Sequence, residues 1–515
     1  MIEPAFDAFA SGYEAGRAQL LYTRLVADME TPVSAYLKLG FAPGGAARDN
    51  AFLLESVQGG ETRGRYSIIG LMPDLIWRCR GGVAEINRAA LHDTDSFVPE
   101  SAKPLESLRA LTRETRLTVP QGLPPMATGL FGYLGYDMAR QVENLPNPPP
   151  DTLGLPDAIL LRPTITAIFD SVKDEIILIT PVWVDKDVDA KAAYARATAR
   201  LEDAVAELER PAPPSAAHLD GKVPANLPTG VPIESNMTKD EYFAVVARAK
   251  EYIMAGDVFQ VVPSQRFRRP FALPPFSLYR ALRRLNPSPY LYYLAMPGFQ
   301  IVGSSPEVLV RLRDGKVTIR PIAGTRPRGK TPEEDKALAE ELMSDPKERA
   351  EHLMLIDLGR NDVGRIAKTG AVTVTGSFFI ERYSHVMHLV SNVEGEIRDG
   401  LDAVDALAAG LPAGTLTGAP KIRAMEIIDE FEKEKRGAVY AGAVGYFAAD
   451  GSMDTCIVLR TALVKDGTMY VQAGGGVVAD SQPEAEYQET INKSKALLAA
   501  AEEAVRFASA AKKGQ

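Results

Sequence analysis

Two pairs of glutamates at helical spacing have the clearest chemical potential in this sequence. Glu348 and Glu351 are three residues apart in KERAEHLM, and Glu486 and Glu489 repeat that spacing in EAEYQETI. Residues three apart lie on one face of a helix. Each pair alone is typical of a solvated salt-bridge face. Two such pairs with few cations beside them could instead supply the oxygen ligands that Mg²⁺ prefers, and the residues alone leave both interpretations open.

Two further features indicate binding of an anion. Gly474, Gly475 and Gly476 are consecutive and flanked by strand-like residues, so bare backbone N–H groups could approach an anion closely, although a β-bulge would also explain them. Arg460 lies among apolar neighbours in CIVLRTALV. A partly buried arginine needs a carboxylate partner. For a lone arginine an internal salt bridge is the simpler expectation, and a substrate carboxylate is the alternative.

Other motifs point away from nucleotide or zinc chemistry. The stretch GTLTGAPK has Gly414 and Gly418 too close together for the phosphate loop G-x-x-x-x-G-K-S/T. His385 and His388 are three apart and apolar-flanked, as core histidines often are, and no cysteine–histidine spacing indicates zinc.

Composition limits the class of protein. A chain of 515 residues with a net charge of −9 predicts one large or two closely packed domains, and argues against nucleic-acid binding as the main function. No apolar run is long enough to span a membrane, and the N-terminus lacks a secretion signal. Cys79 and Cys456 are the only cysteines, which fits a reducing cytoplasm.

The elements that must position these residues can be expected from local patterns. Strand-like runs joined by glycine and proline turns predict a largely antiparallel sheet with helices around it. We expect an N-terminal domain at 1–210, a proline-rich linker at 211–235 and a C-terminal domain at 236–515. Helices are expected at 418–434 and 485–511, and one strand across 452–465.

Helix starts are also predicted. Thr238 and Glu241 form the pattern of a capping box, and Asp345 before Pro346 forms the pattern of an N-cap. Leu353, Ile356 and Leu358 then predict the buried face of the second helix.

Seven collinear blocks carry a family resemblance. From about residue 240 to 500 the chain resembles the chorismate-utilising enzymes in SSPEVLVR, RPIAGTRPRG, ERAEHLMLIDLGRND, YSHVMHLVSNVEG, LPAGTLTGAPKIRAMEII, YAGAVGY and the GGG…AEYQETINKSKAL tail. Through LLESV, GRYSIIG and NPSPYLYYL the chain also resembles the large subunit, component I, of the anthranilate synthases. This resemblance implies an α+β fold of two orthogonally packed antiparallel β-sheets with surrounding helices.

The resemblance also implies a set of site residues. The Mg²⁺ ligands would be Glu351 and Glu489, supported by Glu348 and Glu486. The residues that hold the two carboxylates of chorismate would be Arg460, Tyr440, Lys493 and the amides of Gly474, Gly475 and Gly476. The same pocket would be lined by Gly324, Thr325 and Thr415. Glu307 would be the general acid that protonates the leaving 4-hydroxyl group, and His388 would lie beside the ring.

The implied reaction is a lyase reaction, the first committed step of tryptophan biosynthesis. Ammonia would add to chorismate to give aminodeoxyisochorismate, which loses pyruvate to form anthranilate. Water-adding relatives carry a lysine base in place of Gln260, and aminodeoxychorismate synthase component I typically carries a nucleophilic lysine in place of Ala323. That second enzyme is the alternative within the family. A catalytically inactive paralogue that binds tryptophan or a partner is the alternative from another class.

Regulation and a partner subunit are implied as well. Feedback inhibition by tryptophan would use Glu55, Ser56, Arg65, Pro289, Tyr290 and Leu291. The surroundings of Cys79 and Cys456 do not match a glutaminase nucleophile, so ammonia would come from a separate glutamine amidotransferase subunit, component II, in a heterotetramer of two large and two small chains.

Overall fold

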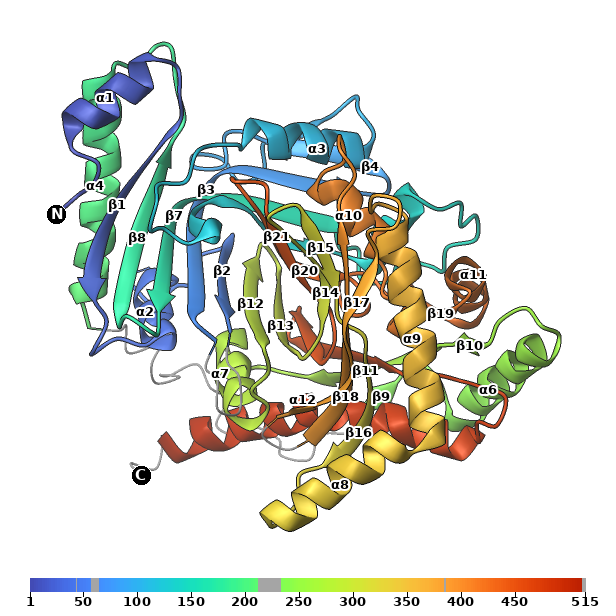
Figure 1. Ribbon diagram of the computed structural model, residues 1–515. Coiled ribbons are helices and arrows are strands. Elements are labelled where there is room, and N and C mark those ends of the chain that lie inside the picture. The colour runs from blue at the N-terminus through green and yellow to red at the C-terminus, as the bar shows by residue number, and fades with distance from the viewer. Residues whose placement is uncertain (43, 57–63, 212–232, 384–385, 512–515) are drawn as a thin grey trace.

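Two long antiparallel strands form the centre of the fold, β3 (Tyr66–Arg80) and β7 (Ala158–Asp170) (Figure 1). The computed structural model describes residues 1–42, 44–56, 64–211, 233–383 and 386–511. Within these residues 21 strands form one connected antiparallel network. The predicted linker therefore lies mostly outside the described residues, as does His385, and the division into two domains stays a prediction.

Two arms of strands leave the β3–β7 pair. The first arm leaves from the N-terminal half of β3 and continues through β2 (Ala51–Glu55), β12 (Tyr290–Met296), β13 (Phe299–Ser305), β22 (Thr461–Lys465), β23 (Thr468–Gly474), β11 (Ser264–Pro270) and β9 (Glu234–Ser235). The second arm leaves from the N-terminal half of β7 and continues through β6 (Gly129–Leu134), β20 (Ala443–Ala448), β21 (Met453–Ile457), β14 (Val308–Arg313), β15 (Lys316–Ile319), β18 (Val386–Glu396), β16 (Ile322–Pro327) and β17 (Thr373–Arg382).

Shorter strands complete the sheets. The outer partners of β7 and β3 are β8 (Glu175–Val182), β1 (Gln19–Val26), β4 (Val83–Asn87) and β5 (Val98–Pro99). A separate pair consists of β10 (Gln260–Val261) and β19 (Gly418–Ala419).

An apolar core joins the two arms. Phe52 on β2 and Phe131 on β6 stack with ring centroids 4.9 Å apart, and both are fully buried. Leu294 of the first arm and Val444 of the second belong to the same cluster. Apolar side chains that alternate along each strand therefore hold the arms together, as in other packed antiparallel sheets.

Helices cover the outside of this core. They are α1 (Phe6–Glu14), α2 (Pro32–Leu39), α3 (Pro104–Glu114), α4 (Ala190–Glu209), α6 (Lys239–Met254), α7 (Pro275–Leu285), α8 (Pro332–Ser344), α9 (Pro346–Gly364), α10 (Ala403–Gly410), α11 (Lys421–Phe431) and α12 (Pro483–Ala511). Short 3₁₀ turns lie at Pro125–Ala127, Tyr136–Gln141 and Gly414–Leu416. Antiparallel strands with outer helices confirm the α+β class. No helix in the described part of the chain is both long and apolar enough to cross a membrane.

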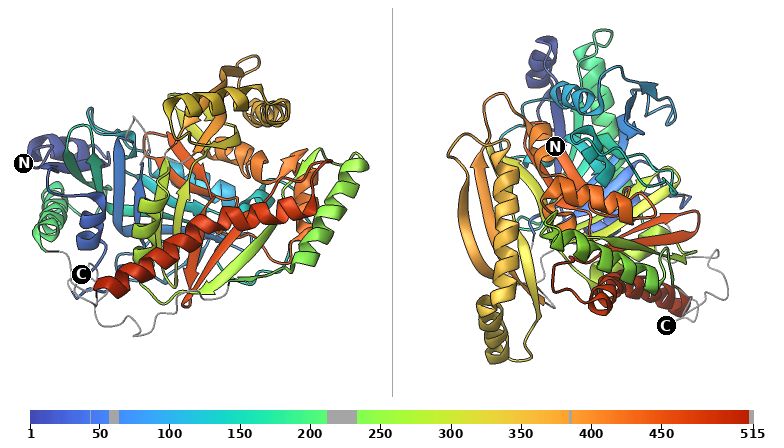
Figure 2. Two further views of the ribbon diagram at one scale, coloured as in Figure 1. Left: turned by 90° about the horizontal axis from the view of Figure 1, so that it is seen from below. Right: turned by 90° about the vertical axis from the view of Figure 1, so that its right-hand side faces the viewer.

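The outer layer that carries α9 is distinct from the body that carries α12. Figure 2 shows α8 and α9, in yellow and gold, on one side of the molecule together with β17, while α12 crosses the body as a long red helix. Helix α9 packs on β18 and β16, whereas α12 packs on α7, α6 and β23. The two E-x-x-E pairs therefore come from different layers.

Both predicted helix caps are confirmed. The Thr238 hydroxyl accepts a hydrogen bond from Glu241 N at 3.2 Å, and the Glu241 carboxylate accepts one from Thr238 N at 2.8 Å. The Asp345 carboxylate accepts hydrogen bonds from the first backbone N–H groups of α9.

Three local predictions are wrong. Residues 452–465 form two strands rather than one, β21 and β22. The strand is interrupted between them, where Arg460 has a φ of +47°. The helix expected at 418–434 begins only at Lys421, after β19 and Pro420. Of the three residues predicted for the buried face of α9, Ile356 is buried, whereas Leu353 is 53% exposed and Leu355 is buried in its place.

Candidate active site

The two glutamate pairs lie close enough to influence each other electrostatically. Burial raises the pKa of Glu351, and the carboxylates of Glu348 and Glu489 raise it further. Burial also raises the pKa of Glu486, to which Glu489 adds. The described residues contain no group of three acidic, histidine or cysteine side chains close enough to enclose a metal ion. The structure thus places α9 and α12 facing each other without closing a complete cage.

Two of the four carboxylates have cationic partners that the sequence pattern did not predict. Arg326 Nη1 lies 3.1 Å from Glu348, and Lys493 Nζ lies 2.7 Å from Glu489. In contrast, Glu486 Oε2 is buried and has no hydrogen-bond partner among the described residues. A buried carboxylate oxygen without a partner is costly. This donor set of hard oxygens, one of them unsatisfied, fits a divalent cation that also takes water and substrate oxygens.

Glu307 has the protonation behaviour of a general acid. It lies between β13 and β14, where its backbone carbonyl accepts a hydrogen bond from Ile457 N at 3.0 Å. Burial raises the pKa of Glu307 to about 7, although the positive charges of Arg460 and Lys493 oppose that rise. A carboxyl group that titrates near neutrality can donate a proton at physiological pH.

Arg460 lacks the internal salt bridge that the sequence favoured. None of the ion pairs among the described residues includes Arg460, and burial lowers its pKa while the charge of Glu307 raises it. The break between β21 and β22 separates Arg460 from the strand ladder. Its guanidinium group is consequently available for a carboxylate from a ligand.

His388 is held as a neutral imidazole of defined tautomer. Its Nδ1 lies 3.0 Å from Gly324 O and 3.1 Å from Thr325 Oγ1. A carbonyl oxygen only accepts hydrogen bonds, so Nδ1 carries the proton and Nε2 keeps a free lone pair. Burial lowers the pKa of His388, which favours this neutral form. Gly324 has a φ of +60°, a conformation that favours glycine.

The glycine run is required by close approach of its neighbours. A Cβ atom on Gly474 would lie 2.8 Å from the Tyr440 hydroxyl, and one on Gly476 would lie 2.5 Å from Gln260 Nε2. A Cβ on Gly475 would lie 3.1 Å from Glu486 Oε2. These distances bring Tyr440, Gln260 and the α12 carboxylates to the same backbone segment. The Gly475 amide already donates a hydrogen bond to Pro263 O at 3.3 Å, and the binding of an anion by the three amides stays a prediction.

Lys493 and Thr415 complete the predicted pocket. Lys493 Nζ donates a hydrogen bond to Gly474 O at 2.9 Å in addition to its ion pair with Glu489. Thr415 lines a small cavity of about 30 Å³ together with Glu307, and its buried hydroxyl has no partner among the described residues. Of the predicted substrate residues, Thr415 alone lines this cavity beside Glu307, whereas Lys493 and Tyr440 contact Gly474.

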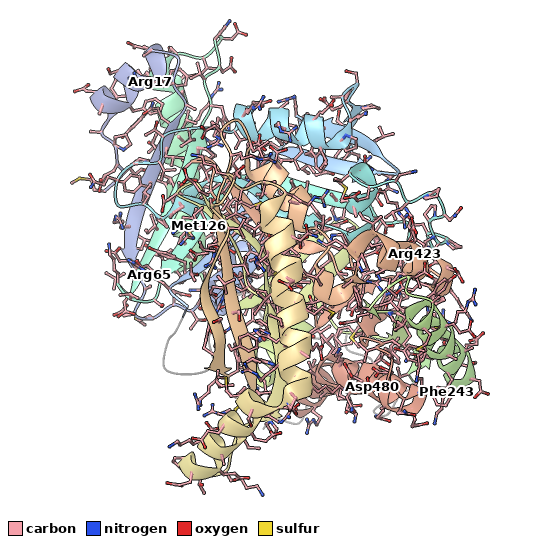
Figure 3. The ribbon with its side chains drawn as sticks, turned by 45° about the vertical axis from the view of Figure 1, so that its right-hand side comes forward. Arg17, Arg65, Met126, Phe243, Arg423 and Asp480 are labelled. Atoms are coloured by element: carbon pink, nitrogen blue, oxygen red, sulfur yellow. The ribbon has the colours of Figure 1, made fainter. Side chains whose placement is uncertain are left out.

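A second, larger cavity of about 290 Å³ lies between the two arms and contains every residue predicted for an inhibitor site. These residues are Glu55, Ser56, Arg65, Pro289, Tyr290 and Leu291. Figure 3 shows Arg65 and Met126, which both line this cavity, on the opposite side of the molecule from Asp480, which precedes α12.

Two of these inhibitor-site residues already have strong partners. Arg65 binds Asp170 with two nitrogens, and Glu55 accepts a hydrogen bond from Arg283 Nε at 2.7 Å. Both residues line the cavity, and the partner of each neutralises its charge.

The sequence reasoning missed several charged residues of this cavity. Arg311 and Arg313 line it from β14, together with Asp454, which accepts a hydrogen bond from Arg311 Nε at 2.8 Å. Their spacing of two along a strand was the available signal, because alternate residues share a face. Pro306 and Val308 also line this cavity, Glu307 between them lines the small cavity beside Thr415, and Val308 lines both.

Known proteins are similar to this chain over nearly its whole length. A family model described as chorismate binding enzyme matches residues 50–499. Anthranilate synthase component 1 of Cereibacter sphaeroides is 59% identical and covers 99% of this chain and 100% of its own length. The Aquifex aeolicus protein of the same name is 46% identical, with 94% of each chain covered.

Solved structures agree with the sequence relatives. The crystal structure of anthranilate synthase component I from Streptococcus pneumoniae has a TM-score of 0.73 and 36% identity, and covers 92% of this chain and 99% of its own. The menaquinone-specific isochorismate synthase of Escherichia coli has a TM-score of 0.64 at 19% identity, covers 95% of this chain and 99% of its own, and so shows a shared fold.

Infrared titration tests the electrostatics of Glu307. We expect the carboxyl band that is lost in Glu307→Gln to convert from the protonated to the ionised form as pH rises through about 7. Replacing Arg460 by Gln removes a positive charge that favours ionisation, so the midpoint should move to higher pH. A Glu307 band that stays ionised from about pH 5 to about pH 9 would contradict the assignment.

Proposed function

The chain belongs to the chorismate-binding enzyme family, and from this premise we propose that it converts chorismate and ammonia to anthranilate and pyruvate as the large component of an anthranilate synthase. One observation carries the proposal: Glu307, whose pKa desolvation raises to about 7, interacts electrostatically with Arg460, which has no ion-pair partner among the described residues. An acid beside an anion-binding cation suits elimination of hydroxide from a dianion.

The reaction balances in two steps. Ammonia forms a bond to C2 of chorismate while the 4-hydroxyl group leaves as water, with its proton supplied by Glu307. In the product, aminodeoxyisochorismate, the proton at C2 is removed as the C3–O bond breaks, which makes the ring aromatic, and the released enolpyruvate takes up a proton at its methylene carbon to become pyruvate. His388 is neutral and has a free Nε2, so it is suited to accept that ring proton.

The proposed substrate contacts divide between charge and shape. Arg460 and Lys493 would bind the carboxylates of chorismate, and the amides of Gly474 to Gly476 would hydrogen-bond the same anionic groups. Tyr440 would contact the substrate from the side of Gly474.

The pocket would be closed by two threonines and a glycine. Thr325 and Gly324 line it next to His388, and Thr415 offers an unpartnered hydroxyl beside Glu307.

We propose Glu351 and Glu489 as the ligands of Mg²⁺, with Glu348 and Glu486 in support. When bound, the ion would neutralise carboxylate charge on the substrate. Glu489 pairs with Lys493 in the described structure, so binding of a cation to Glu489 competes with that ion pair and leaves Lys493 free for a substrate carboxylate. Because Glu351 and Glu489 belong to different layers, one shared ion would also tie α9 to α12.

Two residues support this reaction over its nearest alternative. Gln260 cannot deprotonate water, which disfavours a water-adding enzyme. Ala323 cannot act as a nucleophile, which disfavours the aminodeoxychorismate synthase reaction. The retained acid, histidine and carboxylates disfavour an inactive paralogue.

The ammonia would come from a separate glutamine amidotransferase chain, in a heterotetramer of two large and two small subunits. Both cysteines of this chain are buried, and burial raises the pKa of Cys79 to about 12 and that of Cys456 still higher. A nucleophilic cysteine needs an accessible thiolate. Neither residue suits the glutaminase reaction.

The large cavity between the arms would bind tryptophan as a feedback inhibitor. Its volume of about 290 Å³ is at the lower end of the ~300–1,000 Å³ range of small-molecule pockets. Its wall combines the aromatic Tyr290 and Tyr446 with charged Arg313 and Asp454. Such a lining suits an amphipathic amino acid.

An activity assay tests the central proposal. With chorismate, Mg²⁺ and ammonium we expect anthranilate fluorescence and equimolar pyruvate. Glu307→Gln should lower kcat by about 10²–10⁴-fold, because it removes the proton donor. The exposed Glu340→Gln is the matched control and should retain full activity. Accumulation of aminodeoxychorismate without pyruvate would instead identify the alternative enzyme.

Metal binding can be tested without turnover. We expect Mg²⁺ to raise the melting temperature and EDTA to reverse the rise, because a ligand that binds only the folded state stabilises it. Glu489→Gln should abolish this shift, whereas Glu484→Gln, an exposed acid on the same helix, should keep it. An equal Mg²⁺ shift in both variants would refute the metal assignment.

Filling the larger cavity tests the inhibitor site. Ser56→Phe places a bulky side chain in the cavity wall, so the tryptophan concentration for half-inhibition should rise at least about tenfold, equivalent to ~1.4 kcal/mol. Activity without tryptophan should persist. Ser101→Phe, at an exposed position, serves as the control. Unchanged inhibition of Ser56→Phe would place the inhibitor elsewhere.

A further inference from the structure

Arg436 is a buried arginine that connects three segments of the chain. Its side chain is 1% exposed. The guanidinium group donates hydrogen bonds from Nε to Glu432 Oε2 at 3.0 Å, from Nη1 to Leu416 O at 2.7 Å and from Nη2 to Val262 O at 2.7 Å. One planar group therefore fixes the relative positions of residues that are far apart in the sequence.

Both backbone carbonyls belong to segments of the proposed substrate pocket. Leu416 follows Thr415 in the 3₁₀ turn whose threonine hydroxyl is buried and unpartnered among the described residues. Val262 precedes Pro263, and the carbonyl of Pro263 accepts a hydrogen bond from Gly475 N at 3.3 Å. Movement of either carbonyl would therefore move a residue that the proposed function places against the substrate.

The faces of the guanidinium group make two further contacts. Its carbon lies 5.1 Å from the ring centroid of Tyr440 and 4.7 Å from that of Tyr136. Tyr440 in turn lies against Gly474. Cation–π contacts of this kind fix the orientation of a ring as well as its position.

The partner of Arg436 reaches the same pocket. Glu432 Oε1 lies 2.6 Å from Arg436 Nη2 and accepts hydrogen bonds from Ser264 N at 3.0 Å and Ser264 Oγ at 2.6 Å. Ser264 pairs with Gly474 between β11 and β23. The buried pair of Arg436 and Glu432 carries no net charge. Arg436 therefore acts on the pocket through the positions of the groups that it holds, and not through its charge.

We infer that Arg436 is a positioning residue that holds the Thr415 turn, the Tyr440 ring and the Gly474–Gly475 backbone in one cradle for the anionic substrate. The inference rests on the proposed function, because it takes chorismate as the occupant of that cradle. Arginine presents its donors as a rigid planar fork, whereas lysine presents three donors from a single point. Lysine at this position keeps the charge but cannot reach all three oxygens.

The test compares Arg436→Lys with Arg140→Lys. Arg140 is also largely buried, and it pairs with Asp429 at 2.7 Å and Asp137 at 2.9 Å, but none of its hydrogen bonds and ion pairs in the described part of the chain reaches the cradle. For Arg436→Lys we expect the KM for chorismate to rise about tenfold or more with kcat within about threefold, since small displacements of binding groups weaken positioning. Arg140→Lys should leave KM unchanged at a similar loss of melting temperature.

Binding without turnover gives a second readout. Calorimetric titration with chorismate and Mg²⁺, in the absence of ammonium, should show the same weakening for Arg436→Lys alone. A folded Arg436→Lys with wild-type KM and affinity, or with changes equal to those of Arg140→Lys, would overturn the inference. A wild-type protein that does not turn chorismate over would instead refute the proposed function, so the two failures are distinguishable.

A neutral double variant covers the case in which Arg436→Lys does not fold. Arg436→Gln combined with Glu432→Gln removes both charges together, which avoids leaving one buried charge unpaired. A folded double variant with a raised KM supports the inference, and one with an unchanged KM overturns it. If neither variant folds while Arg140→Lys does, the pair acts on the fold alone and the positioning role is overturned.

Discussion

Desolvation raises the pKa of Glu307 to about 7, and this free-energy cost of ionising the carboxyl group sets the chemistry of the pocket. The same cost acts on Glu351 and Glu486, whose pKa values are also raised by burial. Arg460 experiences the opposite effect, since burial disfavours its charged form. The pocket therefore holds charges of both signs that its own residues only partly neutralise. A dianionic substrate and a divalent cation would satisfy them together.

The parts of this site that could be predicted from sequence are those set by local geometry. The spacing of Glu348 and Glu351 places both on one face of α9 whatever surrounds the helix. The availability of Arg460 could not be predicted from the residues, because it depends on a positive φ that breaks a strand between two partners far away in sequence. The ion pair between Arg326 on β16 and Glu348 likewise could not be predicted from the residues around Glu348. The exposure of Leu353 could not be predicted either. Periodicity shows which residues share one face of a helix, but it does not show whether that face points to the core or to solvent.

The family resemblance predicted site residues that the periodicity of the sequence could not predict. It predicted His388, Glu307 and the residues of the larger cavity, each of which depends on strands paired over long distances. The structure adds the hydrogen bonds that make these residues specific, such as the contact that fixes the tautomer of His388. It also adds Arg311, Arg313 and Asp454, which belong to the second arm, whereas Glu55 and Leu291 belong to the first. The larger cavity is therefore a product of how the arms pack.

The segment from Pro306 to Val308 contributes to both cavities, and this limits which substitutions the protein can accept in evolution. Pro306 lines the larger cavity, Glu307 lines the smaller one, and Val308 lines both. A substitution at either flanking position would alter the wall of the larger cavity and displace the acid, so a loss of the proposed inhibition there would come with a loss of the proposed activity. Ser56 lies at the end of β2 in the other arm, away from the acid. Selection for deregulated but active variants should therefore favour changes on the β2 side of the cavity over changes at the β14 side.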